Sequence, residues 1–264
     1  MIAITERSVR PIATVRPPTP REHGAWGILL IPFATAVGVA GVWNVPVALL
    51  LVSVLCFYVA RTAFLKEVAA GFSLRGQAKI RTLKDAATGA RWTVLLLAGS
   101  AACVLPLLLV WKLWWLAAFG AVAAPLAFRK TERSVVMQLF AVAGLTLTAP
   151  AAWYVATGQL DARLWFLNVL YFAGGVLYVK MHVAAAIQRG GSKLRLGAAT
   201  MIYYGALAVV TALWWPVGVA FVPAIVRAFV GVARLSPVLR IKRLGWTEVG
   251  YSIAFAVLLI LAVR

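Results

Sequence analysis

Residues 92–110 read W-T-V-L-L-L-A-G-S-A-A-C-V-L-P-L-L-L-V and contain no charged side chain. A helix rises about 1.5 Å per residue, so this stretch is long enough to cross the roughly 30 Å hydrocarbon core of a bilayer. The pattern recurs along the chain: 63% of its 264 residues are hydrophobic and 12% are charged. Soluble domains are about half apolar. We therefore expect an all-α, polytopic bundle of transmembrane helices, and the composition excludes disordered, collagen-like and disulfide-rich secreted proteins.

Apolar runs separated by polar segments predict nine spans. These are residues 24–42, 45–61, 92–110, 113–128, 135–157, 163–181, 195–213, 214–233 and 246–263. Eight spans is the alternative, because only Trp214-Trp215-Pro216 separates the seventh segment from the eighth. That tripeptide is either a tight hairpin at the membrane interface or a break within one long segment. Residues 1–23 are predicted to form a basic cytoplasmic tail, and residues 24–264 a single transmembrane helical domain.

The charge of the chain is strongly positive, with 26 Lys and Arg against 7 Asp and Glu, giving a net charge of +19. In a soluble protein this balance would suggest nucleic acid, but in a membrane protein it indicates topology. If the N-terminus is cytoplasmic, 23 of the 26 basic residues lie in or beside cytoplasmic segments. We expect a multi-pass inner-membrane protein with its C-terminus outside. The expected partners are the bilayer and its anionic lipids, and not nucleic acid.

The segment Thr19-Pro20-Arg21-Glu22-His23-Gly24-Ala25-Trp26 precedes the first predicted span. Thr19 and Glu22 have the spacing of a capping box, which is the purely structural interpretation. Glu22 and His23 could also face a polar cavity and act as acid or base, with Trp26 in the cavity wall.

The longest inner loop, 62–91, is long enough for a helix or a helical hairpin against the membrane. Arg81, Lys84, Asp85 and Arg91 would share one face of such a helix, and that face could neutralise a phosphate or diphosphate. The alternative is a solvated topology determinant lying on anionic lipid. The candidate anion-binding residues in and beside this loop are Arg61, Lys66, Arg81, Lys84, Asp85 and Arg91.

The sixth predicted span carries a stripe of hydrogen-bonding groups at helical spacing. Its members are Asn168, Tyr171, Tyr178 and His182, which we predict to line a cavity. Hydrogen bonds between helices are the alternative explanation. Lys180 and Arg189 lie at the inner end of this span and join the candidate anion-binding residues.

Glu248 lies in Gly245-Trp246-Thr247-Glu248, at the predicted start of the last span. It is either a cavity-lining residue or a carboxylate that interacts with the helix dipole. No acidic residue is expected at the middle of a span, which counts against a proton-coupled or cation-coupled carrier. Two cysteines and two histidines are too few, and too widely spaced, to predict a metal site.

The run Pro20-Arg21-Glu22-His23-Gly24-Ala25-Trp26, followed directly by an apolar span, resembles the opening of the YwiC-like family of bacterial membrane proteins. Gly245-Trp246-Thr247-Glu248 is similar to the C-terminal pattern of that family. The resemblance extends over nearly the whole chain in length and span order. It implies an integral membrane protein but no particular reaction.

The layout also resembles UbiA-type intramembrane prenyltransferases, which have nine spans and active loops after the second and sixth. Those enzymes hold magnesium and a prenyl diphosphate on aspartate-rich motifs. This chain has only Glu67 and Asp85 in the first loop and no acid in the second. Magnesium is therefore expected only if the substrate is a diphosphate, with Lys and Arg supplying most of the compensating charge.

Three functions follow from these features. The first is binding or processing of an anionic-headed lipid, such as an isoprenoid phosphate or diphosphate, at the cytoplasmic face. If the chain is an enzyme, the layout implies a UbiA-like transferase acting on a prenyl substrate. The others are transport of a small anion or metabolite, and a membrane scaffold without chemistry of its own. The pattern leaves the cofactor and the oligomeric state open.

Overall fold

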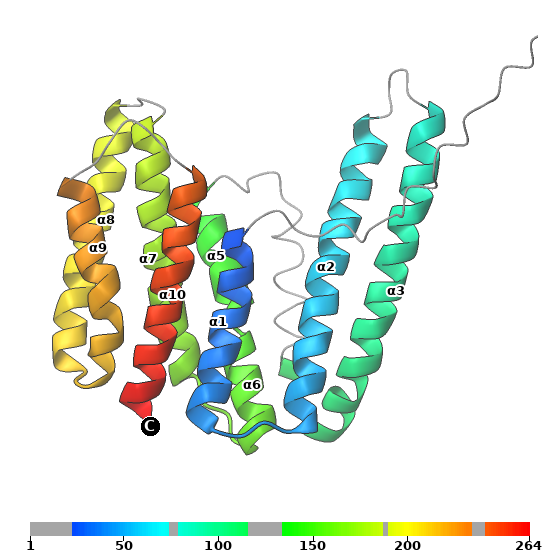
Figure 1. Cartoon of the computed structure of the whole chain (residues 1–264), viewed down its shortest axis with the longest axis horizontal. Coiled ribbons are helices and arrows are strands. Elements are labelled where there is room, and N and C mark those ends of the chain that lie inside the picture. The colour runs from blue at the N-terminus through cyan, green and yellow to red at the C-terminus, as the bar shows by residue number, and fades with distance from the viewer. Residues whose placement is uncertain (1–22, 74–78, 116–133, 187–189, 234–240) are drawn as a thin grey trace, which may run out of the picture. The chain divides into compact units, whose positions relative to one another are not determined.

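The computed structural model describes residues 23–73, 79–115, 134–186, 190–233 and 241–264. Every regular element in these ranges is a helix, which confirms the all-α prediction (Figure 1). The elements are α1 (His23–Ala40), α2 (Val45–Ser73), α3 (Lys79–Trp111), α5 (Val135–Leu145), α6 (Thr148–Thr157), α7 (Arg163–Ala186), α8 (Gly190–Leu213), the short 3₁₀ helix η1 (Val217–Phe221), α9 (Val222–Ala233) and α10 (Ile241–Val263).

Six stretches within the described part are long and apolar enough to cross a membrane. They are Val45–Thr62, Ala90–Trp111, Val135–Thr157, Arg163–Ala186, Arg195–Leu213 and Leu244–Val263. Two shorter apolar stretches, Gly24–Ala40 and Val217–Ala233, accompany them. The chain is therefore a helical membrane protein. The count of nine spans stays a prediction, since most of the predicted span 113–128 lies outside the described residues.

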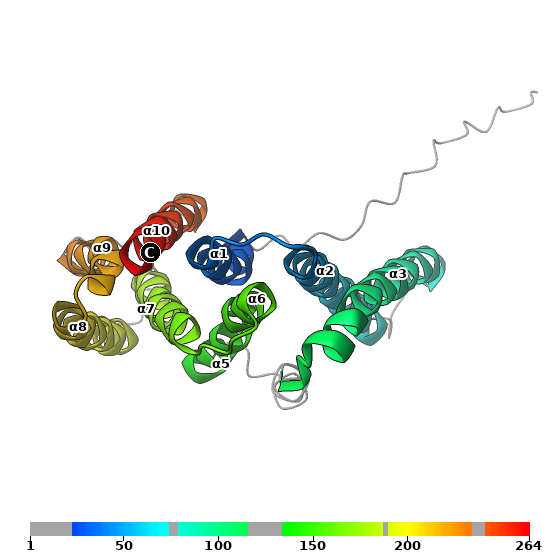
Figure 2. The same ribbon diagram turned by 90° about the horizontal axis from the view of Figure 1, so that it is seen from below.

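The chain divides into two compact units, and the described part of the first lies within Leu55–Ser100, on either side of residues 74–78. It contains the later part of α2 and the earlier part of α3, which lie side by side (Figures 1 and 2). Much of the predicted loop 62–91 is helical in the structure: α2 continues to Ser73, and α3 begins at Lys79. The segment contains no proline and is rich in Ala, Leu, Lys and Arg, all good helix formers.

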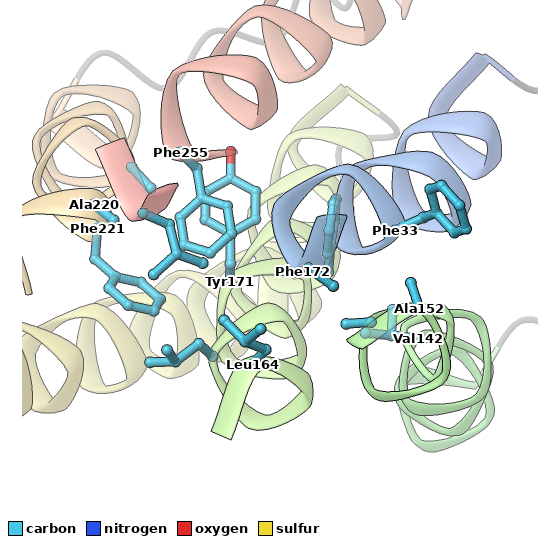
Figure 3. Packing of buried hydrophobic residues seen from close by; sticks show 14 of the residues in the cluster. Phe33, Val142, Ala152, Leu164, Tyr171, Phe172, Ala220, Phe221 and Phe255 are labelled. Atoms are coloured by element: carbon cyan, nitrogen blue, oxygen red, sulfur yellow. The ribbon is translucent and has the colours of Figure 1, made fainter. Parts of the chain in front are cut away.

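The second unit comprises Arg21–Val54 and Ala101–Arg264. Within it α1 packs against α6 and α10, α7 against α8 and α5, and α8 against α9 (Figure 2). Its apolar core includes a stacked pair, with the rings of Tyr171 and Phe255 4.0 Å apart between centroids and 16° between planes. Phe221 packs on the edge of the Phe255 ring (Figure 3). The core thus ties η1, α7 and α10 together.

The predicted span 135–157 is interrupted between α5 and α6. Pro150 lies in the first turn of α6. Its backbone nitrogen carries no hydrogen and cannot donate a helical hydrogen bond, and its ring would clash with the carbonyl four residues earlier in a continuous helix. The hydroxyl of Thr148 instead donates to the carbonyl of Leu29 in α1, at 3.0 Å. The break therefore provides a side-chain link between α6 and α1.

The predicted segments 195–213 and 214–233 are separate helices joined by a tight hairpin, and not one broken span. α8 ends at Leu213, η1 begins at Val217, and α9 packs back along α8. A Cβ atom on Gly218 would lie 2.0 Å from the carbonyl oxygen of Thr211. Only glycine fits this approach between backbones, so Gly218 makes the hairpin possible.

Three neutral hydrogen bonds link α1, the residue before α2, α6 and α7, and we call this group the neutral seam. The amide of Asn168 donates to the Thr35 hydroxyl at 3.1 Å and to the Leu164 carbonyl at 2.8 Å. The second hydrogen bond of the seam is the one from the Thr148 hydroxyl to the Leu29 carbonyl. In the third, the amide of Asn44 donates to the Val155 carbonyl at 3.3 Å.

Candidate anion site

Arg227 of α9 is the centre of the candidate site. It lies within an otherwise apolar helix, and only 7% of the residue is exposed. Its Nη1 atom is 2.5 Å from Oε1 of Glu248 in α10, whose side chain is 18% exposed. A charged side chain within a membrane segment is costly unless it is paired, so this ion pair accounts for the burial of the arginine.

Three tyrosines surround the guanidinium of Arg227. Its Cζ atom lies 4.3 Å from the ring centroid of Tyr178 in α7 and 4.8 Å from that of Tyr251 in α10. Nη2 donates to the hydroxyl of Tyr204 in α8 at 3.4 Å. Aromatic faces attract cations, and the attraction grows when water is excluded. We call Arg227, Glu248, Tyr178, Tyr204 and Tyr251 the charged cluster.

Two glycines leave room for these tyrosines. A Cβ atom on Gly231 in α9 would lie 2.6 Å from the Tyr178 ring. A Cβ atom on Gly174 in α7 would lie 2.8 Å from the Tyr204 hydroxyl oxygen. Both distances are too short for any real side chain. The two tyrosines therefore reach Arg227 because α9 and α7 present bare backbone to them.

The guanidinium of Arg227 retains capacity for another ligand. It has five N–H donors, of which one nitrogen faces Glu248 and another faces Tyr204. Nε is buried and has no hydrogen-bond partner among the described residues. Because planar guanidinium groups bind phosphate and carboxylate oxygens in pairs, the arrangement suits an oxyanion.

Glu248 lies deeper in its helix than the sequence indicated. We expected it at the start of a span beginning near residue 246, and α10 itself begins at Ile241, about two turns before Glu248. Lys242 and Arg243, which suggested a loop, are good helix formers and are compatible with this earlier start. Glu248 therefore lies near the beginning of the candidate span Leu244–Val263, close to its predicted place at the start of the last span.

The stripe predicted on the sixth span divides among three places. Tyr178 belongs to the charged cluster, and the His182 ring lies 4.4 Å from the Tyr178 ring between centroids. Tyr171 packs in the apolar core on Phe255. Asn168 is fully buried in the neutral seam, where it joins helices as the alternative interpretation proposed.

The other predicted residues are not brought to Arg227 by any described contact. Arg61 and Arg91 are exposed and belong to the first unit, whereas Trp26 and Lys180 are half-buried in the second. The backbones of Lys66, Arg81, Lys84 and Asp85 are helical, and His23 begins α1, but the side chains of these five lie outside the described part. Glu22 and Arg189 lie outside the described residues altogether. The roles predicted for all of these residues stay predictions.

Sequence reasoning missed Arg227. The residue is the only charged one in the predicted span 214–233, and we counted it with the topology charges at the inner ends of helices. An arginine several residues inside an apolar span was the available signal. Its partner Glu248 could not be identified, because the pairing crosses between two helices.

A second ion pair offers a contrast at the start of α7. Nη2 of Arg163 lies 2.8 Å from Oδ2 of Asp161, and 88% of the arginine side chain is exposed. The hydrogen bonds from Arg163 hold the pKa of the Asp161 carboxyl below its usual value. Among the described residues, no group of three or more His, Cys, Asp or Glu could hold a metal ion.

A family model described as YwiC-like protein matches residues 19–153, more than half of the chain. The chain belongs to the YwiC-like family. The matched range includes the run Pro20–Trp26 on which the resemblance was based, as well as α1, α2, α3 and α5. No curated protein and no solved structure matches the chain, so the UbiA-like layout gains no support. Arg227 and Glu248 lie beyond the part of this YwiC-like protein that the family model matches.

Proposed function

We propose that this YwiC-like protein binds an amphiphile with a phosphate head group, and that Arg227 is the group that holds the phosphate. The observation that carries the proposal is the burial of Arg227 beside a single counter-ion, with Nε left without a hydrogen-bond partner in the described structure. Ionisable groups inside membrane segments are usually functional, and this one keeps a donor beyond those that face Glu248 and Tyr204.

The surroundings of the charged cluster favour an amphiphile over a free anion. Exposed residues near Arg227 on α9 include Val226 and Val230, and exposed residues near Glu248 on α10 include Trp246 and Ile253. A hydrocarbon chain lying along these residues would bring its head group toward the partly exposed Glu248 and so toward Arg227. Binding of an isoprenoid phosphate is the form of this proposal that we favour.

A second candidate, a carrier for a small anion, is favoured by the location of Glu248 inside a candidate span. Carboxylates within membrane segments often accompany ion-coupled transport. The inner-membrane location and the cytoplasmic N-terminus belong to either proposal. The shared chemistry is a phosphate oxyanion on Arg227, and the source of that oxyanion separates the two.

Native mass spectrometry of the purified protein tests the proposal. The ligands are farnesyl phosphate, phosphatidylglycerol, neutral farnesol and inorganic phosphate. The variant is the double substitution Arg227→Gln with Glu248→Gln, because removing both charges leaves no unpaired ion in the bundle. Charge-assisted hydrogen bonds contribute about 1.5 to 3 kcal/mol, so we expect the double variant to bind farnesyl phosphate or phosphatidylglycerol about tenfold to a hundredfold more weakly.

Arg163→Gln is the matched control. This exposed arginine begins α7, whereas Tyr178, which contacts Arg227, lies toward the other end of that helix, so the substitution should not alter binding. Retention of inorganic phosphate but not of either amphiphile would favour the carrier. Equal retention of all phosphates by the wild type and the double variant would overturn the role of Arg227.

A further inference from the structure

We infer that anion binding at Arg227 is coupled to the uptake of one proton by Glu248. This inference rests on the proposed function, since it concerns the same site. It starts from the fact that the guanidinium already has an anionic partner, the Glu248 carboxylate, at 2.5 Å. A phosphate arriving at Arg227 is therefore a second anion for a single buried cation.

Two anions beside one cation would leave a net negative charge among apolar helices. Such an uncompensated charge is expensive, and buried carboxylates are usually neutralised by taking up a proton. The carboxylate that has lost its partner is Glu248, which would take a proton from water and become a neutral carboxylic acid. The new O–H group can then donate a hydrogen bond to the bound phosphate.

The titratable groups around Glu248 indicate that Glu248 is the one that takes up the proton. Facing the cluster are Arg227 from α9 and Tyr204 from α8, with Tyr251 on α10 itself. From α7 come Tyr171, Tyr178 and His182. The helix α1 also packs on α10, and the only titratable residue in its range is His23, whose side chain lies outside the described part. The 3₁₀ helix η1 contains no titratable residue.

Glu248 is the only acidic residue in this set, so a second anion competes with it directly. Its side chain is also the more exposed member of the pair, at 18% against 6% for Arg227. As the more exposed partner, this carboxylate can leave the arginine without unpacking the helices. His182 is the histidine beside Tyr178 of the cluster, and it provides the control.

Linkage sets the size of the effect. If one proton enters with each anion, the dissociation constant rises about tenfold for each pH unit over the range in which Glu248 is ionised in the free protein. The probe must keep a constant charge over that range, and the phosphodiester of phosphatidylglycerol does so. Isothermal titration of the full-length protein in detergent, with short-chain phosphatidylglycerol, measures both affinity and proton uptake. Short-chain phosphatidylcholine, which adds a cationic choline to the same phosphodiester, is the control ligand.

Titrations in two buffers of different ionisation enthalpy, between about pH 5 and about pH 8, give the number of protons bound. We expect about one proton per phosphatidylglycerol for the wild type and for His182→Gln. We expect none for Glu248→Gln, which should bind with an affinity that does not change with pH. The wild-type and His182→Gln measurements decide the matter even if Glu248→Gln fails to fold.

The outcomes separate this inference from the proposed function. Selective binding of phosphatidylglycerol without proton uptake would overturn the coupling and leave the anion site standing. Proton uptake that disappears in His182→Gln would overturn the assignment to Glu248. Failure of both phosphatidylglycerol and farnesyl phosphate to bind would overturn the proposed function, and the coupling with it.

Discussion

The neutral seam and the charged cluster both place polar side chains between apolar helices, but they satisfy them differently. In the seam, Asn168 donates to Thr35 and to a carbonyl of its own helix, and no charge is involved. In the cluster, Arg227 depends on Glu248 for charge compensation. Its Nε has no hydrogen-bond partner among the described residues, and neither has Oδ1 of Asn168 in the seam. This difference suggests different roles. The seam holds helices together, whereas in the cluster the Glu248 carboxylate is a counter-ion of Arg227 that another anion can replace.

The largest expected effect comes from breaking the charge balance of the cluster. Arg227→Gln or Glu248→Gln alone should lower the free energy of unfolding by about 3 to 5 kcal/mol, because each leaves a buried charge unpaired. The double variant should lose less than either single one. Unfolding in mixed micelles by denaturant gives all four free energies of a double-mutant cycle. Additive losses would show that the two charges do not depend on each other.

The packing that positions the cluster can be disturbed without touching a charge. Gly231→Ala should force the Tyr178 ring aside and cost about 1 to 3 kcal/mol, which is typical of overpacking. Gly250→Ala in α10 is the matched control, since a Cβ atom there would meet nothing within 4 Å. Thermal melting in detergent compares the two variants. Equal melting temperatures would mean that Tyr178 moves without cost.

Removing the polar groups of the seam should cost much less. Hydrogen bonds between membrane helices contribute about 0.6 kcal/mol on average, so Thr35→Val should cost about that much. The double change Asn168→Leu with Thr35→Val should be nearly neutral, because no polar partner is then left unsatisfied. The same unfolding assay tests both variants. A loss as large as that of Arg227→Gln would remove the distinction between seam and cluster.

The smallest effect is expected at the exposed pair of Asp161 and Arg163, which belongs to neither region. Asp161→Asn should lower the melting temperature only slightly at neutral pH, since exposed ion pairs contribute little. The pKa of Asp161 is lowered in the folded protein, so its contribution is present above the ordinary carboxyl pKa of about 4 and is lost as the pH falls through the lowered value. The wild type and the variant should therefore melt alike in acid. A difference that persists there would contradict this sign.

Much of the fold could be predicted because a bilayer demands long apolar helices, and those are visible as uninterrupted runs. The hairpin at residues 213–217 left two interpretations open, and the close approach of Gly218 to Thr211 shows which one holds. The predicted spans 45–61, 92–110 and 246–263 agree within two residues with the apolar stretches Val45–Thr62, Ala90–Trp111 and Leu244–Val263. The helices α2, α3 and α10 extend beyond these spans for a single reason. Lys and Arg mark loops by their charge, yet they also extend helices beyond the apolar core.

The candidate site was harder to predict than the fold. The stripe on α7 pointed to Tyr178 and His182, since spacing along one helix is readable from the sequence. Arg227 and Glu248 are 21 positions apart on two helices, and nothing in either segment alone reveals that they meet. Asn168 belonged to the same stripe but turns toward α1, because the two ends of α7 have different neighbours.

The ion pair of Arg227 and Glu248 has an electrical consequence. A membrane potential acts on net charge, at about 2.3 kcal/mol per elementary charge for each 100 mV. The pair carries no net charge, and exchange of the carboxylate for a singly charged phosphodiester plus a proton leaves that sum at zero. The membrane potential would therefore have little influence on whether the site is occupied. If the arginine stood alone, binding of an anion would move net charge, and occupancy would depend on the membrane potential.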